Sequence, residues 1–258
     1  MKALSQPKTY NQQVPDAKSF NALRDEWRAK LASDDALRDQ AIQLIIEGNK
    51  YNFGYQWEWC GVPIIRHPDD IVLQQEIMWG LKPHRVIETG VARGGSLVLS
   101  STLMAMSGKN SRVLGLDIQI LPHATESLES WIKDGSIELM ECDSSSGAAV
   151  HRVETFLKGV TEPSLLILDS NHSHEHVYGE LSALAPLLPV GSIVIVADTI
   201  VEEMPENYYP NRPWGKGNNP RTAITQFIND QPNFAFDNRW GRRSLLGECR
   251  DGILIRSY

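Results

Sequence analysis

Several common features are scarce or missing in this chain of 258 residues, and each absence excludes a class of protein. No apolar run approaches the roughly 20 residues that a membrane-spanning helix needs, so we expect no membrane partner. The three cysteines, Cys60, Cys142 and Cys249, form no C-x-x-C pair, which argues against a disulfide framework and against a zinc ribbon. The N-terminal residues 1–21 lack the basic-then-apolar order of a secretory signal, which predicts a cytoplasmic protein.

Positive charge is also in short supply. Lys and Arg number 25 against 32 Asp and Glu, for a formal net charge of -7. Because phosphate binding normally requires a basic face, this balance argues against nucleic acid as the main partner. With 41% apolar and 22% charged residues, the composition is that of a globular protein. The length suits one large α/β domain with a helical N-terminal appendage.

Short apolar runs alternate with helical patterns along most of the chain. Such alternation predicts a doubly wound, mostly parallel sheet, with crossover helices between strands that are buried on both faces. The last two runs are separated by too little sequence for a helix, so we expect an antiparallel edge there. The expected strands are 85–88, 112–117, 137–142, 165–169, 192–198, 234–240 and 252–258; the expected helices are 19–48, 68–80, 96–107, 124–133, 148–158 and 173–188.

Two further segments have no clear period. Residues 51–59 hold five aromatics and predict either a hydrophobic plug over the core or part of a ligand pocket. Residues 199–221 are too long for a simple connector, so they predict either a lid over the substrate or a surface excursion. The apolar N-terminal helix and the aromatic segment would also suit the interface of a homo-oligomer.

The first expected strand leads into a glycine turn, V-I-E-T-G-V-A-R-G-G-S, at residues 86–96. A dinucleotide-binding turn would have the spacing G-x-G-x-x-G, whereas Gly90, Gly94 and Gly95 have the spacing G-x-x-x-G-G. Glycines there let a ligand approach the backbone, and the next helix offers free N–H groups. Glu88 would repel a pyrophosphate but suits a cation, such as the amino acid part of S-adenosylmethionine.

The next two strands also end in acids. Asp117 is placed to accept both ribose hydroxyls of an adenosine cofactor, and Asp143 to accept its adenine amino group. Three acids on successive strand ends therefore predict that the chain binds an adenosine ligand.

Several longer stretches complete the pattern: Y-N-F from Tyr51, P-I-I-R-H-P-D-D-I from Pro63, the glycine turn, G-L-D-I with P-H-A after it, L-I-L-D-S-N-H-S-H-E-H-V from Leu166, V-G-S-I-V-I-V-A-D-T-I from Val190 and W-G-K-G-N-N-P-R-T-A from Trp214. In these stretches the chain resembles the class I S-adenosylmethionine-dependent methyltransferases, and among them the family named for cephalosporin hydroxylase and rhamnosyl O-methyltransferase.

The resemblance implies a seven-stranded sheet, a cofactor held by Glu88, Gly90, Asp117 and Asp143, and a divalent metal beside the methyl group. We expect the cofactor site to include also Thr89, Gly94, Gly95, Ser96, Ile118, Ser144 and Asp169. The chain would then divide into a helical and aromatic cap, residues 1–62, and a methyltransferase domain, residues 63–258.

A second group of candidates follows the fourth and fifth strands. Asp169 and Asp198 would converge there, and two carboxylates suit a magnesium ion that keeps several waters. Such a cation lowers the pKa of an acceptor hydroxyl and aligns it with the methyl group. Relatives usually carry an acid where this chain has Ala197. Catechol-type O-methyltransferases have Ala-Asp-Asn there, which would make Thr199 the third ligand.

The proton acceptor is a separate question, because Asn171 stands where related enzymes often have a second acid. His172 and His174 follow Asp169 closely, so either one would be placed to accept a substrate proton. A zinc site on H-x-H-x-H is disfavoured, since alternate histidines at a helix start point in different directions. The expected catalytic residues are Asp169, His172 and His174.

These observations favour an enzyme that transfers a methyl group from S-adenosylmethionine to a hydroxyl of a small molecule, a sugar or a secondary metabolite, with help from magnesium. Ala197 and Asn171 keep a second hypothesis open, a cofactor-binding protein of the same fold without this catalysis. An NAD-type oxidoreductase is a third, disfavoured by the glycine spacing and by Glu88.

Overall fold

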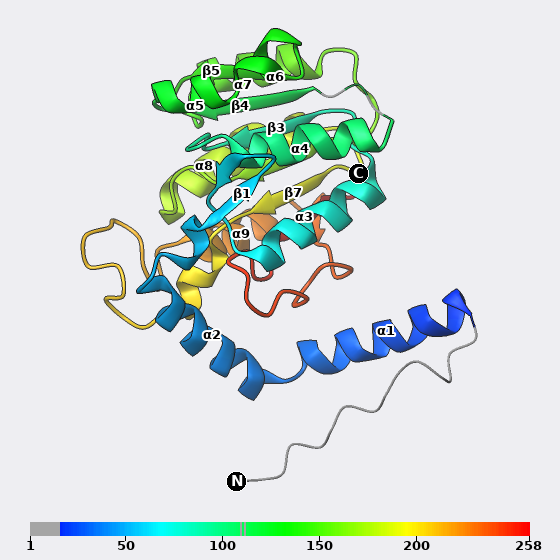
Figure 1. Ribbon diagram of the computed structural model, residues 1–258, viewed down its shortest axis with the longest axis vertical. Coiled ribbons are helices and arrows are strands. Elements are labelled where there is room, and N and C mark those ends of the chain that lie inside the picture. The colour runs from blue at the N-terminus through cyan, green and yellow to red at the C-terminus, as the bar shows by residue number, and fades with distance from the viewer. Residues whose placement is uncertain (1–15, 109, 111) are drawn as a thin grey trace.

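The computed structural model describes residues 16–108, 110 and 112–258, and a seven-stranded sheet runs through it (Figure 1). Its spatial order is β5-β4-β3-β6-β7-β9-β8. The pairs among β3 to β7 are parallel, whereas β9 is antiparallel to both β7 and β8. The expected fold, with its antiparallel edge, is confirmed. The strands are β3 (Val86–Thr89), β4 (Val113–Asp117), β5 (Ile137–Glu141), β6 (Leu165–Leu168), β7 (Ile193–Val196), β8 (Phe234–Phe236) and β9 (Ile253–Arg256).

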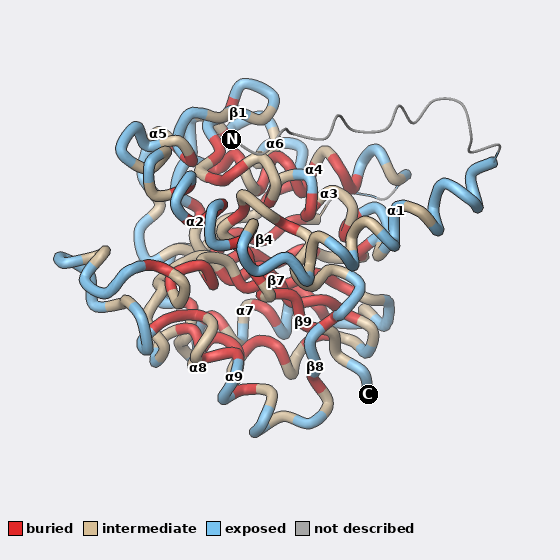
Figure 2. The backbone as a smooth tube through the Cα atoms, turned by 90° about the horizontal axis from the view of Figure 1, so that it is seen from below, coloured by how far each residue is buried: buried red, intermediate tan, exposed pale blue. Residues whose placement is uncertain are grey.

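Helices cover both faces of this sheet. Side chains alternate between the two faces along each strand, so Val86 packs with the first group of helices and Ile87 with the second. Figure 2 shows the resulting buried layer along the strands. The first group is α3 (Pro68–Leu81), α4 (Gly95–Met106), α5 (Pro122–Ser127) and α6 (Glu129–Lys133); the second is α7 (Gly147–Leu157), α8 (His174–Leu184) and α9 (Pro220–Asp230).

The strand order reverses between β3 and β6, which are neighbours although β4 and β5 separate them in sequence. In an open α/β sheet, ligands bind beyond the carboxyl ends of the strands at such a reversal. Glu88 lies on β3, and Asp169 directly follows β6. The topology therefore brings these two acids to the same crevice.

The N-terminal region differs from the single helix expected at 19–48. It forms α1 (Ala17–Ala32) and α2 (Asp35–Asn49), because the Asp34 side chain accepts a hydrogen bond from Leu37 N at 2.9 Å and starts a new helix. Helix α1 buries none of its residues and extends away from the sheet (Figure 1). Across the described part of the chain, no helix has both the length and the apolar character needed to cross a bilayer.

The aromatic segment combines both of its expected roles. After a 3-10 turn, η2 (Phe53–Tyr55), it forms a hairpin of β1 (Trp57–Trp59) and β2 (Val62–Ile64). Trp57 and Trp59 pack against the core, and Trp59 donates to the Thr102 hydroxyl of α4 at 2.9 Å. Tyr55 is exposed and lines the pocket described below. The expected boundary between residues 62 and 63 falls inside β2.

The segment after β7 leads into a helix, α9, that the sequence analysis did not predict; it begins at the end of the expected loop 199–221. A 3-10 turn, η4 (Thr199–Glu203), comes first, and α9 begins at a capping box. The Asn219 side chain accepts from Arg221 N at 3.0 Å and from Thr222 N at 3.3 Å. Tyr208 and Tyr209 of the intervening loop pack beside Ile42 and Ile45 of α2, which ties this loop to the N-terminal region.

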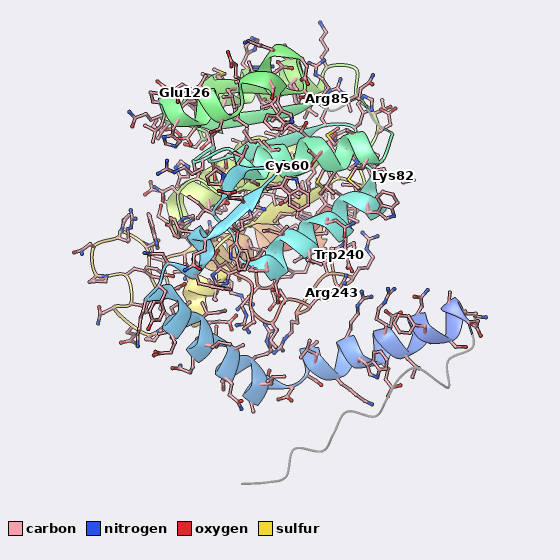
Figure 3. All side chains as sticks on the ribbon, viewed as in Figure 1. Cys60, Lys82, Arg85, Glu126, Trp240 and Arg243 are labelled. Atoms are coloured by element: carbon pink, nitrogen blue, oxygen red, sulfur yellow. The ribbon has the colours of Figure 1, made fainter. Side chains whose placement is uncertain are left out.

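The connection between β8 and β9 is long and irregular, and α3 determines its path. Asp69 accepts from the backbone N–H groups of Leu245 and Leu246, at 3.0 and 2.8 Å. Asp70 accepts from those of Glu248 and Cys249, at 2.7 and 3.2 Å. Trp240 and Arg243 of the same connection lie below α3 in Figure 3 and stack at 5.0 Å. Two adjacent acids at the start of α3 thus carry this connection to the crevice.

Replacing Asn219 by alanine should destabilise the protein without changing its core. Loss of a helix cap costs about 1 kcal/mol, which lowers the melting temperature by roughly 2–4 °C in a chain of this size. Differential scanning calorimetry measures the change, and Asn229→Ala, an exposed position on the same helix, is the control. Equal melting temperatures for the two variants would show that the capping box does not hold α9.

Candidate active site

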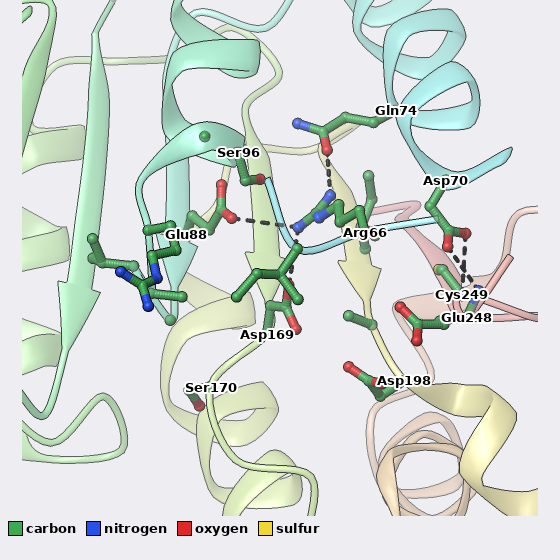
Figure 4. A pocket seen from close by; sticks show the side chains of 18 of the residues that line it. Arg66, Asp70, Gln74, Glu88, Ser96, Asp169, Ser170, Asp198, Glu248 and Cys249 are labelled. Atoms are coloured by element: carbon green, nitrogen blue, oxygen red, sulfur yellow. Dashed lines mark hydrogen bonds and ion pairs between the residues drawn. The ribbon is translucent and has the colours of Figure 1, made fainter. Parts of the chain in front are cut away.

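A pocket of about 270 Å³ opens at the strand-order reversal (Figure 4). The structure brings eight of the expected site residues to its lining: Glu88, Gly90, Gly94, Gly95, Ser96, Asp169, His172 and Asp198. Seven others lie outside it: Thr89, Asp117, Ile118, Asp143, Ser144, His174 and Thr199. The pocket therefore joins the glycine turn to the predicted metal position, and the expected adenosine contacts lie beyond it.

The glycines of the turn are required by the packing of the chain itself. A Cβ on Gly90 would lie 2.0 Å from the Asp169 carbonyl oxygen, and one on Gly95 would lie 2.4 Å from that of Pro63. Gly94 has a φ of +90° and packs against Leu128. Packing within the chain is therefore a second reason for these glycines, beside the expected close approach of a ligand, which stays a prediction.

Asp117 and Asp143 stand on the open edge of β4 and β5. Asp117 accepts from Val91 N at 2.7 Å, which fastens the glycine turn to the end of β4, and from Gln119 N at 3.0 Å. Asp143 is exposed and accepts from the backbone N–H and the hydroxyl of Ser145, which lower the pKa of the Asp143 carboxyl. Both acids hold the backbone around them through hydrogen bonds. They lie on a surface that an extended ligand could reach.

Arg66, which the sequence analysis did not single out, lies between Glu88 and Asp169. Its Nη2 is 3.3 Å from Glu88 Oε1 and 3.2 Å from Asp169 Oδ2 (Figure 4). Burial raises the pKa of Glu88, and Arg66 opposes that rise. One feature of the sequence could have indicated Arg66: it is a basic residue in P-I-I-R-H-P-D-D-I, just before the helix that leads into the sheet. Its partners lie 22 and 103 positions further along the chain.

Asp169, His172 and Asp198 form a compact group whose candidate ligand atoms all lie within 4.8 Å of one another. His172 Nδ1 is 3.5 Å from Asp198 Oδ2. Asp198 adopts a φ of +54°, a left-handed conformation that costs energy outside glycine and is typical of functional sites. Burial, Asp198 and Glu88 together raise the pKa of Asp169 against the influence of Arg66.

Thr199 was expected to be the third metal ligand, but its side chain lies outside the pocket that holds Asp169 and Asp198. Its hydroxyl is buried, donates to the Arg250 carbonyl at 2.7 Å and accepts from Arg250 N. Asp198 and Thr199 are adjacent at a strand end, where successive side chains point in different directions. The His172 imidazole, and not the Thr199 hydroxyl, lies beside the two carboxylates.

The structure also separates the two candidate bases. Both ring nitrogens of His174 have partners on α9: Nδ1 lies 2.8 Å from the Thr222 hydroxyl, and Nε2 lies 3.0 Å from Gln226 Oε1. His172 lines the pocket, with its ring edge-on to Trp214 at 4.9 Å. Asn171 accepts from Ser173 N at the start of α8. Only His172 of these three presents its side chain to the pocket.

Glu248 is a second residue that the sequence analysis missed. It lines the pocket, with its Oε1 3.5 Å from His67 Nε2. Burial, with Asp198, Asp70 and Asp169 nearby, raises the pKa of this carboxyl well above its usual value. Glu248 N donates a hydrogen bond to Asp70, and this contact with α3 brings Glu248 to the pocket. Because the contact is distant in sequence, no local motif predicts it.

Two features test whether the residues present suit a cationic ligand and a metal. Glu88 Oε2 is buried and makes no hydrogen bond of good geometry among the described residues, although the neighbouring Ser96 hydroxyl lowers the pKa of this carboxyl. A carboxylate oxygen accepts more than one hydrogen bond, so Oε2 can take one from an ammonium group. Asp169 and Asp198 offer oxygen donors, which magnesium prefers, and His172 adds a nitrogen that manganese or zinc would also accept. The donor set fits a divalent cation.

Asp198→Asn should stabilise the ligand-free protein. Like charges nearby help to hold the pKa values of Asp169 and Glu248 high, so ionising these two acids costs folding stability as the pH rises through their raised pKa values. Removing the Asp198 charge should raise the melting temperature by about 2–4 °C at pH 8, for roughly 1 kcal/mol.

That difference should shrink as the pH falls below the raised pKa values, because Asp169 and Glu248 are then protonated. Magnesium should stabilise the original protein but not this variant. Glu154→Gln, on the exposed surface of α7, is the matched control. A lower melting temperature for Asp198→Asn at every pH would refute this account of the pocket.

Comparison with known proteins places the fold and the site in a family. Two relatives are named Rhamnosyl O-methyltransferase. That of Mycobacterium leprae is 28% identical over 217 residues, 81% of this chain and 89% of the relative. That of Mycobacterium tuberculosis is 28% identical over 201 residues, 77% of this chain and 78% of the relative.

Solved structures of CmcI share the fold. An apo-structure has a TM-score of 0.57 and 20% identity, covering 79% of this chain and 77% of that chain. One with Mg and SAM has a TM-score of 0.53 and 21% identity, covering 79% and 78%. The family described as Rhamnosyl O-methyltransferase/CmcI matches residues 51–257, which include the whole sheet and every residue of the pocket. The chain therefore belongs to the Rhamnosyl O-methyltransferase/CmcI family and is a methyltransferase.

Proposed function

We propose that this protein transfers the methyl group of S-adenosylmethionine to a hydroxyl of a small molecule, with a divalent cation, magnesium, held beside the acceptor. The observation that carries the proposal is the pocket itself. Glu88, with a buried oxygen that can accept a hydrogen bond, faces the same cavity as Asp169 and Asp198. One acid would take the donor's ammonium group, and the other two would hold the cation.

The donor would extend from this pocket along the open edge of the sheet. Its amino acid part would lie at Glu88 and the turn formed by Gly90, Gly94 and Gly95. Its adenosine would lie toward Asp117 and Asp143. Ile118 is 72% exposed beside Asp117, and an exposed apolar side chain there suits contact with the flat face of a base.

A sugar hydroxyl is the acceptor we favour. The relatives from Mycobacterium leprae and Mycobacterium tuberculosis are named Rhamnosyl O-methyltransferase, which supports this choice. Tyr55 lines the pocket, and Trp214 contacts His172. Aromatic faces of this kind pack against the apolar side of a sugar ring.

His172 would accept the acceptor's proton, and in this role its ring would not be a metal ligand, because a nitrogen bound to the cation cannot also take up a proton. As the oxygen forms its bond to the methyl carbon, the carbon–sulfur bond breaks and its electron pair remains on sulfur. The hydroxyl proton passes to an imidazole nitrogen, and Asp198, 3.5 Å from Nδ1, stabilises the imidazolium that results. A bound divalent cation would lower the pKa of the hydroxyl.

Ligand-dependent melting tests the first part of this proposal. S-adenosylmethionine or S-adenosylhomocysteine, at about 100 times its dissociation constant, should stabilise the protein by roughly 2.7 kcal/mol, whereas NAD should not. Glu88→Gln should weaken either ligand by about 10–100-fold, because a charge-assisted hydrogen bond is lost. The control is Glu58→Gln, an exposed position on β1. No shift with either adenosylated ligand would rule the proposal out.

Two histidine variants test the assignment of the base. His172→Ala should lower turnover by about 10²–10⁴-fold while donor affinity, measured by calorimetry, stays unchanged. His174→Ala should alter stability through its lost contacts with α9 and leave turnover within about threefold, since its nitrogens do not reach the pocket. Equal losses of turnover in both variants would contradict the separation of their roles.

Ala197 and Asn171 are the residues on which the alternative hypothesis rested, a protein that binds the donor without transferring its methyl group. Ala197 lines the pocket without offering a ligand atom, and the Asn171 side chain is bonded to Ser173 N. Two results together would favour that hypothesis: the donor raises the melting temperature, and no methyl group is transferred to any sugar hydroxyl tested.

A further inference from the structure

The guanidinium of Arg66 occupies the point where the two proposed ligand positions meet. It is 6% exposed, and its Nη2 contacts Glu88 on one side and Asp169 on the other (Figure 4). Glu88 is the proposed acceptor for the donor's ammonium group, and Asp169 is a proposed metal ligand. A fixed positive charge therefore already pairs with both acids that are meant to receive incoming cations.

Two helices hold this guanidinium in place. Gln74 of α3 accepts a hydrogen bond from Arg66 Nη1, and the Gln74 amide donates to the Ser100 hydroxyl of α4 at 2.9 Å. All three side chains are buried. Because Nη1 is anchored through Gln74, the guanidinium stays at the junction, and Nη2 is free to exchange one carboxylate partner for another.

The charges that line the pocket indicate which new partner Arg66 Nη2 could take. Among the described lining residues there are five acids but two arginines, and Arg93 is exposed at the rim. The amino acid part of the donor is a zwitterion whose ammonium and carboxylate share one carbon atom. When Glu88 takes the ammonium, the carboxylate comes close to Glu88 as well. It then needs a buried cation, and Arg66 is the buried arginine of this lining.

We propose that Arg66 binds the α-carboxylate of the methyl donor and, in doing so, releases Asp169 to the divalent cation. This inference rests on the proposed function. The Arg66–Glu88 and Arg66–Asp169 pairs are lost, and three new pairs replace them: the ammonium with Glu88, the carboxylate with Arg66, and the divalent cation with Asp169. Arg66 is thus a positioning residue that links the donor site to the metal site.

The linkage has a definite sign. Before the donor binds, the guanidinium neutralises part of the charge on Asp169 and competes with a metal ion. After the donor carboxylate takes over the guanidinium, Asp169 becomes a stronger ligand. Binding of the donor should therefore tighten binding of the metal, and by thermodynamic reciprocity the metal should tighten binding of the donor by the same factor.

Isothermal titration calorimetry with two ligands tests the first part. One ligand is S-adenosylhomocysteine, and the other is the same nucleoside thioether with an aminopropyl chain that lacks the carboxylate. In the original protein, loss of the carboxylate should weaken binding by about 10–100-fold. In Arg66→Gln the two ligands should bind within about threefold of each other, because the group that distinguishes them is gone.

Arg93→Gln is the matched control, and it should keep the full preference for the carboxylate. Arg66→Lys should keep an intermediate preference, since lysine retains the charge but not the two-pronged geometry. If Arg66→Gln does not fold, an undiminished preference in Arg66→Lys overturns the proposal. An undiminished preference in a folded Arg66→Gln overturns it as well, as does a preference abolished by Arg93→Gln.

Magnesium titrations test the second part. S-adenosylhomocysteine should lower the dissociation constant of Mg²⁺ by about 5–150-fold in the original protein, the usual range for coupled sites. In Arg66→Gln the dissociation constant of Mg²⁺ should be the same with and without this ligand. Coupling that persists in the variant overturns the linkage. Failure of the original protein to bind S-adenosylhomocysteine at all would instead contradict the proposed function, and the inference with it.

Discussion

The interaction on which the site depends is the pairing of one buried arginine with two acids, one buried and one half-buried, at the carboxyl edge of the sheet. Glu88 and Asp169 are brought together by the neighbouring strands β3 and β6, with Asp198 and Glu248 nearby. Carboxylates that are buried together without a cation would repel one another and lose their hydration. Arg66 offsets part of this cost, and the Gln74 and Ser100 side chains hold Arg66 there.

Parts of the chain that are far apart in sequence help to form the pocket. Asp69 and Asp70, at the start of α3, accept four backbone N–H groups from the connection between β8 and β9. Those contacts place Glu248 and Cys249 in the pocket lining. The edge of the sheet farthest from the glycine turn thus contributes to the same cavity. Strain and like-charge repulsion remain at Asp198, as is common where stability is exchanged for function.

Asn171 and Ala197 are the two positions where the sequence departs from the pattern that the resemblance implies, and the structure shows how their neighbours are arranged. The Asn171 side chain supports the first turn of α8, while His172 turns into the pocket beside Asp198. Ala197 contributes no ligand atom, and Thr199 is bonded to the Arg250 backbone. An imidazole therefore stands beside the two carboxylates, in a group with one nitrogen and two oxygen donors.

The sequence by itself determined the sheet, its antiparallel edge and most of the acids in the pocket. These features are local: a buried strand is a short apolar run, and an acid at its carboxyl end must lie on the ligand-binding edge whatever the rest of the chain does. The tertiary structure alone decided the positions of Arg66, Glu248, His172 and Thr199. Arg66 and Asp169 are 103 residues apart, so their contact depends on how α3 packs against the sheet. The choices between His172 and His174, and between Thr199 and His172, depended on which way each side chain points at a strand end or helix start, which residue spacing does not specify.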